Sequence, residues 1–185
     1  MGRNKLLMPF QGGTVIGRTL DNLLASKAGE IVVVLGARAQ EMGKAMGERP
    51  VTLVLNPDYA RGMSTSLITG LGMVSKRAKF IMVALGDQPL VTHRTYNKLI
   101  EAALATDKGI IVPVFKKQRG NPILIHAGYI PDVRRFTGDV GGRELLTANP
   151  EDVLEVKVPD EGIIININTV EEYEKHIGTG PRPRA

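Results

Sequence analysis

The 185-residue sequence contains no cysteine. The chain can therefore form neither a disulfide framework nor a thiolate metal site, and it has no cysteine nucleophile. Aromatic residues make up only 4% of the chain and hydrophobic residues 43%, so its interior must be mostly aliphatic. The length suits one ordinary domain with a sizeable core. The absence of cysteine fits a reducing cytoplasm, where we expect the protein to reside.

Long apolar runs are also missing. Leu6 and Leu7 follow the basic Arg3 and Lys5, as in a secretory signal, but Pro9 ends this run too early. No other stretch is long enough to span a bilayer, so we expect no membrane partner.

The net charge of +5 is modest, and basic residues are interspersed with acidic ones. This pattern favours a phosphorylated small molecule over nucleic acid as the partner, although charge alone does not separate the two.

Apolar β-branched runs alternate with amphipathic segments in the first part of the chain, which predicts βαβ units. Strands this apolar are expected to be covered on both faces, as in a mostly parallel sheet. The expected strands are residues 31–35, 51–55, 80–85 and 110–115, and the expected helices are residues 14–26, 64–75 and 93–105.

The alternation of apolar and amphipathic segments changes after residue 115. There Arg119-Gly120-Asn121-Pro122 predicts a turn or hairpin before the apolar run 123–125. The sequence contains no internal repeat, long linker or second core, so we expect one domain over residues 1–177 and a flexible tail over residues 178–185. The remaining expected elements are a short helix at 141–147, strands at 153–158 and 163–167, and a closing helix at 170–177 with Thr169 as its N-cap.

Gly86-Asp87-Gln88-Pro89-Leu90 directly follows the apolar run 80–85. Ligands of open α/β sheets bind beyond the carboxyl ends of strands, so Asp87 is expected in the binding crevice. A carboxylate there can hold Mg²⁺, which bridges phosphate oxygens. The alternative is that Asp87 only begins a turn, where Asp and Pro are both common.

Two further segments suit a phosphorylated ligand. Lys5 can supply the positive charge that nucleotidyl transfer requires, or it is a solvated charge near the terminus. Asn56 and the segment Gly62-Met63-Ser64-Thr65-Ser66 lie between a predicted strand and helix, where free backbone NH groups and hydroxyls can receive a nucleotide. The alternative is that Ser64 or Thr65 is an ordinary N-cap.

Polar motifs continue in the second half. In Arg119-Gly120-Asn121-Pro122, Asn121 can hydrogen-bond but cannot carry positive charge, and a tight turn is the alternative. In Gly138-Asp139-Val140-Gly141-Gly142-Arg143, Arg143 suits a substrate phosphate, while Asp139 suits either a ligand or a helix cap. Strand alternation would place Asn166 and Asn168 on one face, where their carbonyl oxygens can ligate a hard cation, unless Asn168 caps the closing turn.

Taken together, these segments resemble the molybdenum cofactor cytidylyltransferases of the MobA-like NTP transferase family. Met1-Gly2-Arg3-Asn4-Lys5-Leu6-Leu7-Met8-Pro9 is similar to the second half of the family's nucleotide-binding loop, Arg-Met-Gly-x-x-Lys followed by Leu-Leu-x-Pro. The family's further motifs follow in order along the chain. They are Gly-Met-Ser-x-Ser, Arg-Gly-His-Pro with Asn121 in place of histidine, and Gly-Asp-x-Gly-x-Arg. The guanylyltransferase branch usually has Gly-Gly-x-Asp-Lys and Cys-Asp-x-Pro instead, so the resemblance favours CTP over GTP.

The resemblance implies an α/β, three-layer Rossmann-like nucleotidyltransferase fold with a mostly parallel sheet from which the first strand is missing. It implies transfer of CMP from CTP to the terminal phosphate of molybdenum-molybdopterin, with release of pyrophosphate and Mg²⁺ as cofactor. Lys5 and Asp87 would be catalytic, and Asp87, Asn166 and Asn168 would hold the metal. The nucleotide would be bound by Gly2, Lys5, Asn56, Gly62, Ser64, Thr65, Gly86 and Gln88, and the second substrate by Arg119, Asn121, Asp139 and Arg143.

Two alternatives stay open. One is a non-catalytic accessory protein that binds the molybdenum cofactor or a nucleotide and serves a molybdenum hydroxylase as partner. The other is a nucleotidyltransferase with another phosphorylated acceptor. Without the first strand, strand edges and apolar helix faces stay uncovered, so we expect weak or absent turnover and a tendency to associate.

An ionised phosphate nucleophile needs no general base. This agrees with the three histidines, His93, His126 and His176, which have no motif context and are expected to be surface or capping residues.

Overall fold

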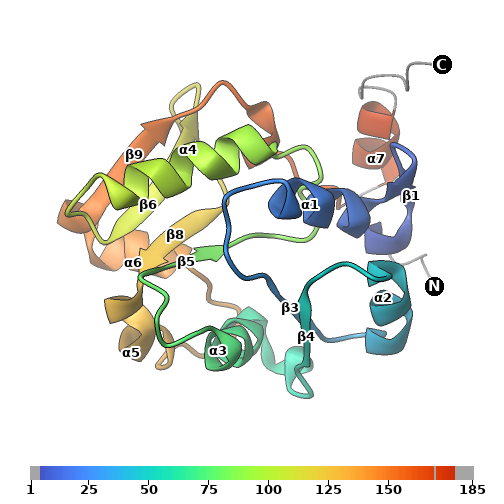
Figure 1. Ribbon diagram of the computed structural model, residues 1–185, viewed down its shortest axis with the longest axis horizontal. Coiled ribbons are helices and arrows are strands. Elements are labelled where there is room, and N and C mark those ends of the chain that lie inside the picture. Colours follow the sequence, from blue (N-terminus) through green and yellow to red (C-terminus); the bar gives the residue numbers. More distant parts are fainter. Residues whose placement is uncertain (1–4, 169, 178–185) are drawn as a thin grey trace.

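The computed structural model describes residues 5–168 and 170–177, which form an α/β fold (Figure 1). Its helices are α1 (Val15–Leu24), α2 (Ala39–Met46), α3 (Met63–Met73), α4 (His93–Leu104), α5 (Ile130–Val133), α6 (Arg143–Ala148) and α7 (Val170–Ile177). Its strands are β1 (Pro9–Phe10), β2 (Gly13–Thr14), β3 (Val32–Leu35), β4 (Thr52–Leu55), β5 (Phe80–Val83), β6 (Ile110–Phe115), β7 (Gln118–Arg119), β8 (Ile123–His126) and β9 (Val153–Lys157). Short 3₁₀ helices occur at Lys5–Leu7, Tyr59–Arg61, Ala127–Tyr129, Pro150–Asp152 and Glu161–Ile164.

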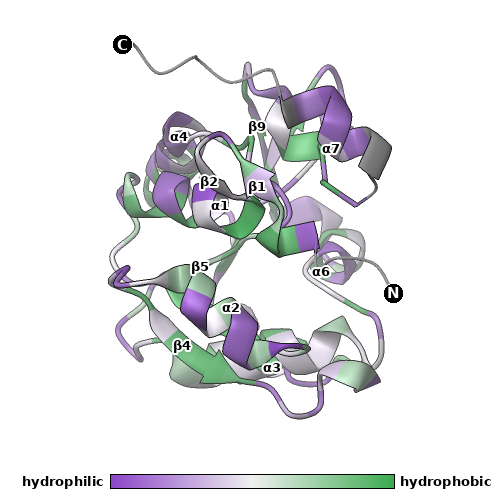
Figure 2. Ribbon diagram, turned by 90° about the vertical axis from the view of Figure 1, so that its right-hand side faces the viewer, coloured by the Kyte–Doolittle hydropathy of each residue, from purple (hydrophilic) through white to green (hydrophobic). Residues whose placement is uncertain are grey.

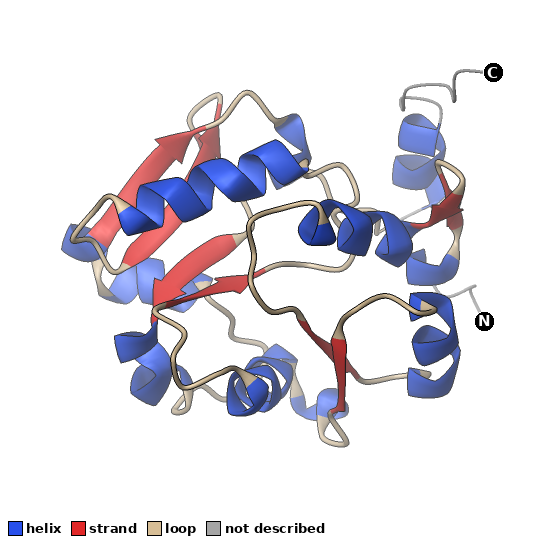
Figure 3. Cartoon of the chain, viewed as in Figure 1, coloured by secondary structure: helices blue, strands red, loops and turns tan. Residues whose placement is uncertain are grey.

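The larger sheet has the strand order β5-β8-β6-β7, with β9 also paired to β6 (Figure 3). Strands β5, β6 and β9 run in one direction, and β8 lies antiparallel between β5 and β6. Along β6, Ile110 and Val112 enter one core and Ile111 enters another, as expected for a strand covered on both faces. Leu71 of α3 joins the first core and Leu99 of α4 joins the second, so the three-layer α/β prediction is confirmed.

A smaller parallel sheet consists of β3 and β4, with Val32 opposite Thr52 and Leu35 opposite Leu55. Strand β4 is apolar (Figure 2), and its Leu53 and Leu55 are 43% and 60% exposed. Within the described residues β3 pairs only with β4, and β5 pairs only with β8. The described strands therefore form three sheets, counting the antiparallel pair of β1 and β2, and no ladder joins β3 to β5.

Contacts near both ends nevertheless link the segments that carry β3 and β5. Glu30 precedes β3 and Ser75 precedes β5, and the backbone NH of Ser75 donates to Glu30 Oε2 at 3.1 Å. Beyond the two strands, Leu6 lies next to both Leu35 and Gly86. These contacts link the smaller parallel sheet to the larger sheet across the break.

Two helices hold the sheets together from opposite faces. On one face, α1 packs Leu20 against Leu35 and contributes Leu23 to the core that contains Ile111. On the other face, α3 packs Leu71 against Ile81, and a Cβ on Gly70 would lie 3.0 Å from Val34 Cγ2. Side-chain packing, rather than backbone pairing, therefore joins β3 to β5.

The predicted strand at residues 163–167 is wrong. The Glu161–Ile164 segment forms a 3₁₀ turn, which Asp160 begins by accepting the Gly162 amide at 3.0 Å. The residues that follow are in neither a helix nor a strand up to Asn168. The sequence analysis also missed α2 and α5, whereas β6 and α7 have the predicted bounds. The predicted N-cap Thr169 and the tail 178–185 lie outside the described residues.

Among residues 5–168 and 170–177, no helix combines the length and the apolar character that a membrane crossing requires.

A polar contact at the amino end of β6 allows a test of stability against pH. Tyr129 Oη donates to Asp152 Oδ2, and the Gly109 amide donates to Asp152 Oδ1 at 2.9 Å. The hydrogen bond from Tyr129 holds the pKa of Asp152 below its usual value, and burial together with this contact raises the pKa of Tyr129 to about 12. The two groups therefore stabilise the fold when Asp152 is ionised and Tyr129 is protonated.

We expect Tyr129→Phe to lower the free energy of unfolding by about 1 kcal/mol at pH 7. Because the pKa of Asp152 is lower in the folded state, this difference is present above its unfolded pKa of about 4 and fades as the pH falls below it. Urea unfolding of both proteins at pH 7 and pH 3 measures the effect. A difference that is equal at the two pH values would contradict it.

Candidate functional site

Side chains from three distant segments meet just beyond β5. Lys5 Nζ lies 2.9 Å from Asp87 Oδ2 and also donates to Asn168 Oδ1. The side chain of Asp87 is 17% exposed and that of Lys5 is 39% exposed. The cluster therefore combines a cation with two oxygen ligands and is open enough to receive a charged molecule.

Helix α1 supports the turn that carries Asp87. Thr19 Oγ1 donates to the Gly86 carbonyl and Asn22 Nδ2 donates to the Pro89 carbonyl, both at 3.1 Å. Both side chains are buried. The sequence analysis missed this support, although two polar residues three positions apart on the apolar face of a predicted helix were a usable signal.

Three predicted motifs meet at the carbonyl oxygen of Ile163. It accepts hydrogen bonds from Gln88 Nε2 at 3.1 Å and from the backbone NH of Asn121 at 2.9 Å. Gln88 Nε2 also donates to Asn166 Oδ1 at 2.8 Å. The Asp87 turn, the turn around Asn121 and the segment that carries the two asparagines are thus connected beneath the cluster.

Gly120 lies so close to this carbonyl that a side chain does not fit. A Cβ on Gly120 would lie 2.3 Å from the Ile163 oxygen, a backbone atom that cannot rotate away. We expect Gly120→Ala to lower the free energy of unfolding by about 1–3 kcal/mol, because the two segments must separate.

The matched control for Gly120 is Gly72→Ala in α3, where a Cβ would meet nothing within 4 Å. Because alanine favours a helix, we expect this variant to match the wild type or exceed its stability by up to about 1 kcal/mol. Thermal unfolding of both variants measures the difference. Equal stability of the two variants would contradict the close approach at Gly120.

Asn56 and Thr65 are brought together, as predicted, but they are bonded to each other. Asn56 is buried, and its Nδ2 donates to Thr65 Oγ1 at 2.9 Å and to Ser66 Oγ at 3.0 Å. Asn56 Oδ1 accepts the Asp58 amide at 3.0 Å. These contacts shape the loop before α3, and their role in nucleotide binding stays a prediction.

The loop before α3 is also joined to the second glycine-rich motif. Ser64 Oγ donates to the Gly138 carbonyl at 2.8 Å, and Asp139 Oδ1 accepts the Met63 amide at 3.2 Å. Gly62, with a φ of 115°, allows this approach, since a Cβ there would lie 2.3 Å from the Gly138 carbonyl group. Asp139 therefore binds the first backbone amide of α3 from another segment, and its predicted role toward a substrate stays a prediction.

The predicted substrate-binding arginines are both exposed. Arg119 Nε donates to Glu155 Oε1 at 2.7 Å, and Arg143 begins α6. No described contact joins either arginine to Lys5 or Asp87, so their role stays a prediction. Gly2 lies outside the described residues.

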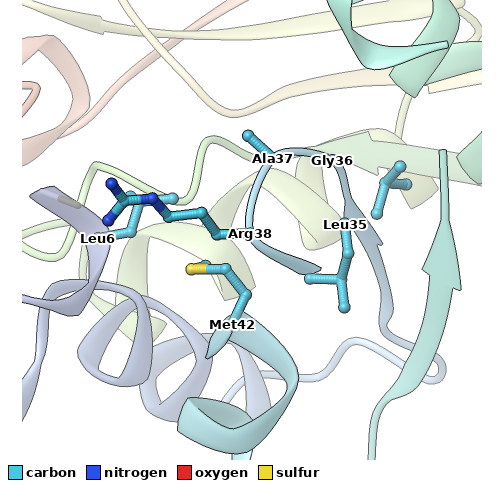
Figure 4. Close-up of a pocket in the computed structure, with 7 residues that line it drawn as sticks. Leu6, Leu35, Gly36, Ala37, Arg38 and Met42 are labelled. Atoms are coloured by element: carbon cyan, nitrogen blue, oxygen red, sulfur yellow. The ribbon is translucent and has the colours of Figure 1, made fainter. Parts of the chain in front are cut away.

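A cavity that the sequence analysis did not predict adjoins the cluster through Leu6 (Figure 4). It has a volume of about 430 Å³, and the guanidinium of Arg38 lies over it. Arg38 has a φ of 55°, in the left-handed region, at the start of α2. The lining residues are Leu6, Val34, Leu35, Gly36, Ala37, Arg38 and Met42.

The oxygen atoms around Lys5 suit a hard cation. Asp87 supplies one carboxylate and Asn168 one amide oxygen, and the Lys5 ammonium already contacts both. Asn166 Oδ1 accepts from Gln88 and Asn168 Oδ1 accepts from Lys5, so Asn168 is the asparagine that shares a partner with Asp87. The described residues contain no group of three His, Asp or Glu side chains that could hold a metal, so phosphate and water oxygens would have to complete the shell.

Known proteins are similar to this chain in sequence and in fold. It is 31% identical to nicotine blue oxidoreductase of Paenarthrobacter nicotinovorans over 184 residues, covering 93% of this chain and 87% of that protein. It is 26% identical to molybdenum cofactor cytidylyltransferase of Escherichia coli K12 over 174 residues, covering 94% and 86% of the two chains.

Among solved structures, Rv0371c of Mycobacterium tuberculosis H37Rv is similar with a TM-score of 0.86 and 28% identity, covering 96% of this chain and 90% of that one. Its complex with manganese gives a TM-score of 0.84 with 27% identity, over 97% and 95% of the two chains. The MobA-like NTP transferase domain matches residues 1–153. With this match over most of its length, the chain belongs to the MobA-like NTP transferase family.

Proposed function

We propose that this chain is a Mg²⁺-dependent cytidylyltransferase that transfers CMP from CTP to the terminal phosphate of molybdenum-molybdopterin and releases pyrophosphate. The observation that carries the proposal is the contact of Lys5 with both Asp87 and Asn168 beyond β5. Family membership supports nucleotidyl transfer as the class of reaction. The relative named molybdenum cofactor cytidylyltransferase supports the choice of CTP and of the acceptor.

The reaction is an in-line displacement at phosphorus. A terminal phosphate oxygen of the pterin forms a bond to the α-phosphorus of CTP, and the bond from that phosphorus to the β-phosphate oxygen breaks. Pyrophosphate leaves with the electron pair of the broken bond. The attacking phosphate is already ionised near neutral pH, so no residue has to remove a proton.

The protein contributes position and charge. Lys5 neutralises phosphate oxygens that gain negative charge in the transition state. Asp87 and Asn168 would hold Mg²⁺, which supplies Lewis-acid stabilisation of phosphate oxygens when bound. Because the only carboxylate of this set is Asp87, metal affinity depends on that residue and on the nucleotide's own phosphates.

Calorimetric titration tests the proposal. CTP and GTP are each titrated into the protein with and without Mg²⁺. We expect CTP to bind only with Mg²⁺ and GTP to bind at least about tenfold more weakly, a difference of about 1.4 kcal/mol. Equal affinity for GTP would contradict the choice of nucleotide, and no binding of either would contradict nucleotidyl transfer by this chain.

A cofactor-binding accessory protein for molybdenum hydroxylases is the second candidate. The amide side chains of Asn166 and Asn168 favour it, because they add no negative charge for a metal. Such a protein would bind molybdenum-molybdopterin without releasing pyrophosphate from CTP. A pyrophosphate assay with both substrates present therefore separates the two candidates.

The relative named as an oxidoreductase introduces a different class of reaction. Lys5 and Asp87 favour phosphate chemistry, because neither side chain can accept or donate electrons. The same pyrophosphate assay, run beside a test for an oxidation-reduction reaction, distinguishes these activities.

A further inference from the structure

A single buried amide connects the segments beneath the candidate site. The side chain of Gln88 is only 2% exposed. Its Nε2 donates to the Ile163 carbonyl at 3.1 Å and to Asn166 Oδ1 at 2.8 Å. Gln88 follows Asp87 directly, so both partners are fixed relative to the turn that carries the carboxylate.

The segment that Gln88 contacts receives no support from a sheet. The 3₁₀ turn ends at Ile164, and the chain is irregular from there to Asn168. The Ile167 amide donates to the Asp87 carbonyl at 2.8 Å, and the Asn168 amide donates to Glu172 Oε2 at 2.7 Å. Without ladder hydrogen bonds, individual contacts such as these determine where Asn168 lies.

We propose that Gln88 is a positioning residue for the metal side of the site, an inference that rests on the proposed function. By holding Ile163 and Asn166, it keeps Asn168 beside Asp87 and Lys5. Gln88 acts through these groups and has almost no surface with which to contact a nucleotide. Residues that orient metal ligands typically raise metal affinity by roughly 10- to 100-fold. We expect the contribution of Gln88 to lie in this range.

The test replaces Gln88 with methionine, which has a similar length and volume but no hydrogen-bond donor. The first measurement is hydrogen exchange of the Ile167 and Asn168 amides, which needs no ligand. We expect faster exchange at both amides in Gln88→Met. The second measurement is binding of Mn²⁺ in the presence of CTP, followed by electron paramagnetic resonance. We expect the Kd for Mn²⁺ to rise about tenfold.

The control is Tyr129→Phe, which removes a hydrogen bond at the opposite end of β6. This variant should lose about as much stability as Gln88→Met. It should keep wild-type exchange at residues 167 and 168 and wild-type Mn²⁺ affinity. Such a contrast separates positioning from a general loss of stability.

The outcomes distinguish this inference from the proposed function. Unchanged exchange at both amides overturns the positioning role, whatever the metal affinity does. Faster exchange with unchanged Mn²⁺ affinity overturns the link to the metal. A wild-type protein that binds no Mn²⁺ with CTP contradicts the proposed function, while the exchange measurement still decides whether Gln88 holds the segment.

Discussion

Replacing Asp87 with asparagine is expected to weaken Mg²⁺-dependent CTP binding by at least about 100-fold, or about 2.7 kcal/mol. The change keeps the shape of the side chain and removes its negative charge. Among the described residues, Asp87 is the carboxylate that contacts Lys5, which also contacts Asn168. The remaining amide oxygens cannot compensate, since they carry no charge for a hard cation.

Asp132→Asn is the matched control for this result. Asp132 is an exposed carboxylate in α5 that lies 3.4 Å from Arg135 Nη1, so the substitution changes the net charge by the same amount. Calorimetry of both variants with CTP and Mg²⁺ measures the effect. If the two variants bound CTP equally well, Asp87 would have no role in holding the metal.

Replacing Lys5 with methionine is expected to lower the rate of pyrophosphate release by about 10²- to 10³-fold. The ammonium group acts on charge that develops in the transition state, so CTP binding should weaken much less than the rate falls. Lys5→Arg should be intermediate. It restores a positive charge, but its planar guanidinium cannot place that charge where a compact ammonium does.

Lys27→Met controls for the loss of a positive charge. Lys27 lies 2.6 Å from Glu101 Oε1, and both side chains are about 60% exposed. Its loss should leave both the rate and the affinity unchanged, because exposed ion pairs contribute little. A Lys5→Met protein that kept more than about a third of the wild-type rate would be inconsistent with a catalytic role for Lys5.

Local patterns predicted those parts of the fold that depend on local contacts. The apolar run before Gly86 indicated a strand followed by a turn, and β5 is followed by a turn at residues 86–87. The antiparallel position of β8 between β5 and β6 had no local signal, because the choice of strand neighbour depends on the whole chain. The isoleucine-rich run at residues 163–167 resembled a strand, but within the described residues it joins no ladder, and a turn capped by Asp160 forms at its start.

In the candidate site, too, contacts between distant segments had no local signal in the sequence. That Lys5 meets Asp87, 82 positions away, followed from the family resemblance and not from any spacing in the sequence. The contacts of Asn56, Ser64 and Gln88 could not be predicted, because each side chain suits a ligand and a buried hydrogen bond equally well. Burial in the structure separates these roles for Gln88, whose amide is enclosed between two segments.

The break between β3 and β5 affects how the protein responds to denaturation. A two-stranded sheet is marginally stable by itself, so β3 and β4 depend on side chains from α1 and α3. Breaking those contacts releases this part of the chain without disrupting the ladder between β6 and its neighbours. We therefore expect the smaller parallel sheet to open at a lower free energy than the larger sheet. We then expect unfolding curves followed at a probe in each sheet to differ.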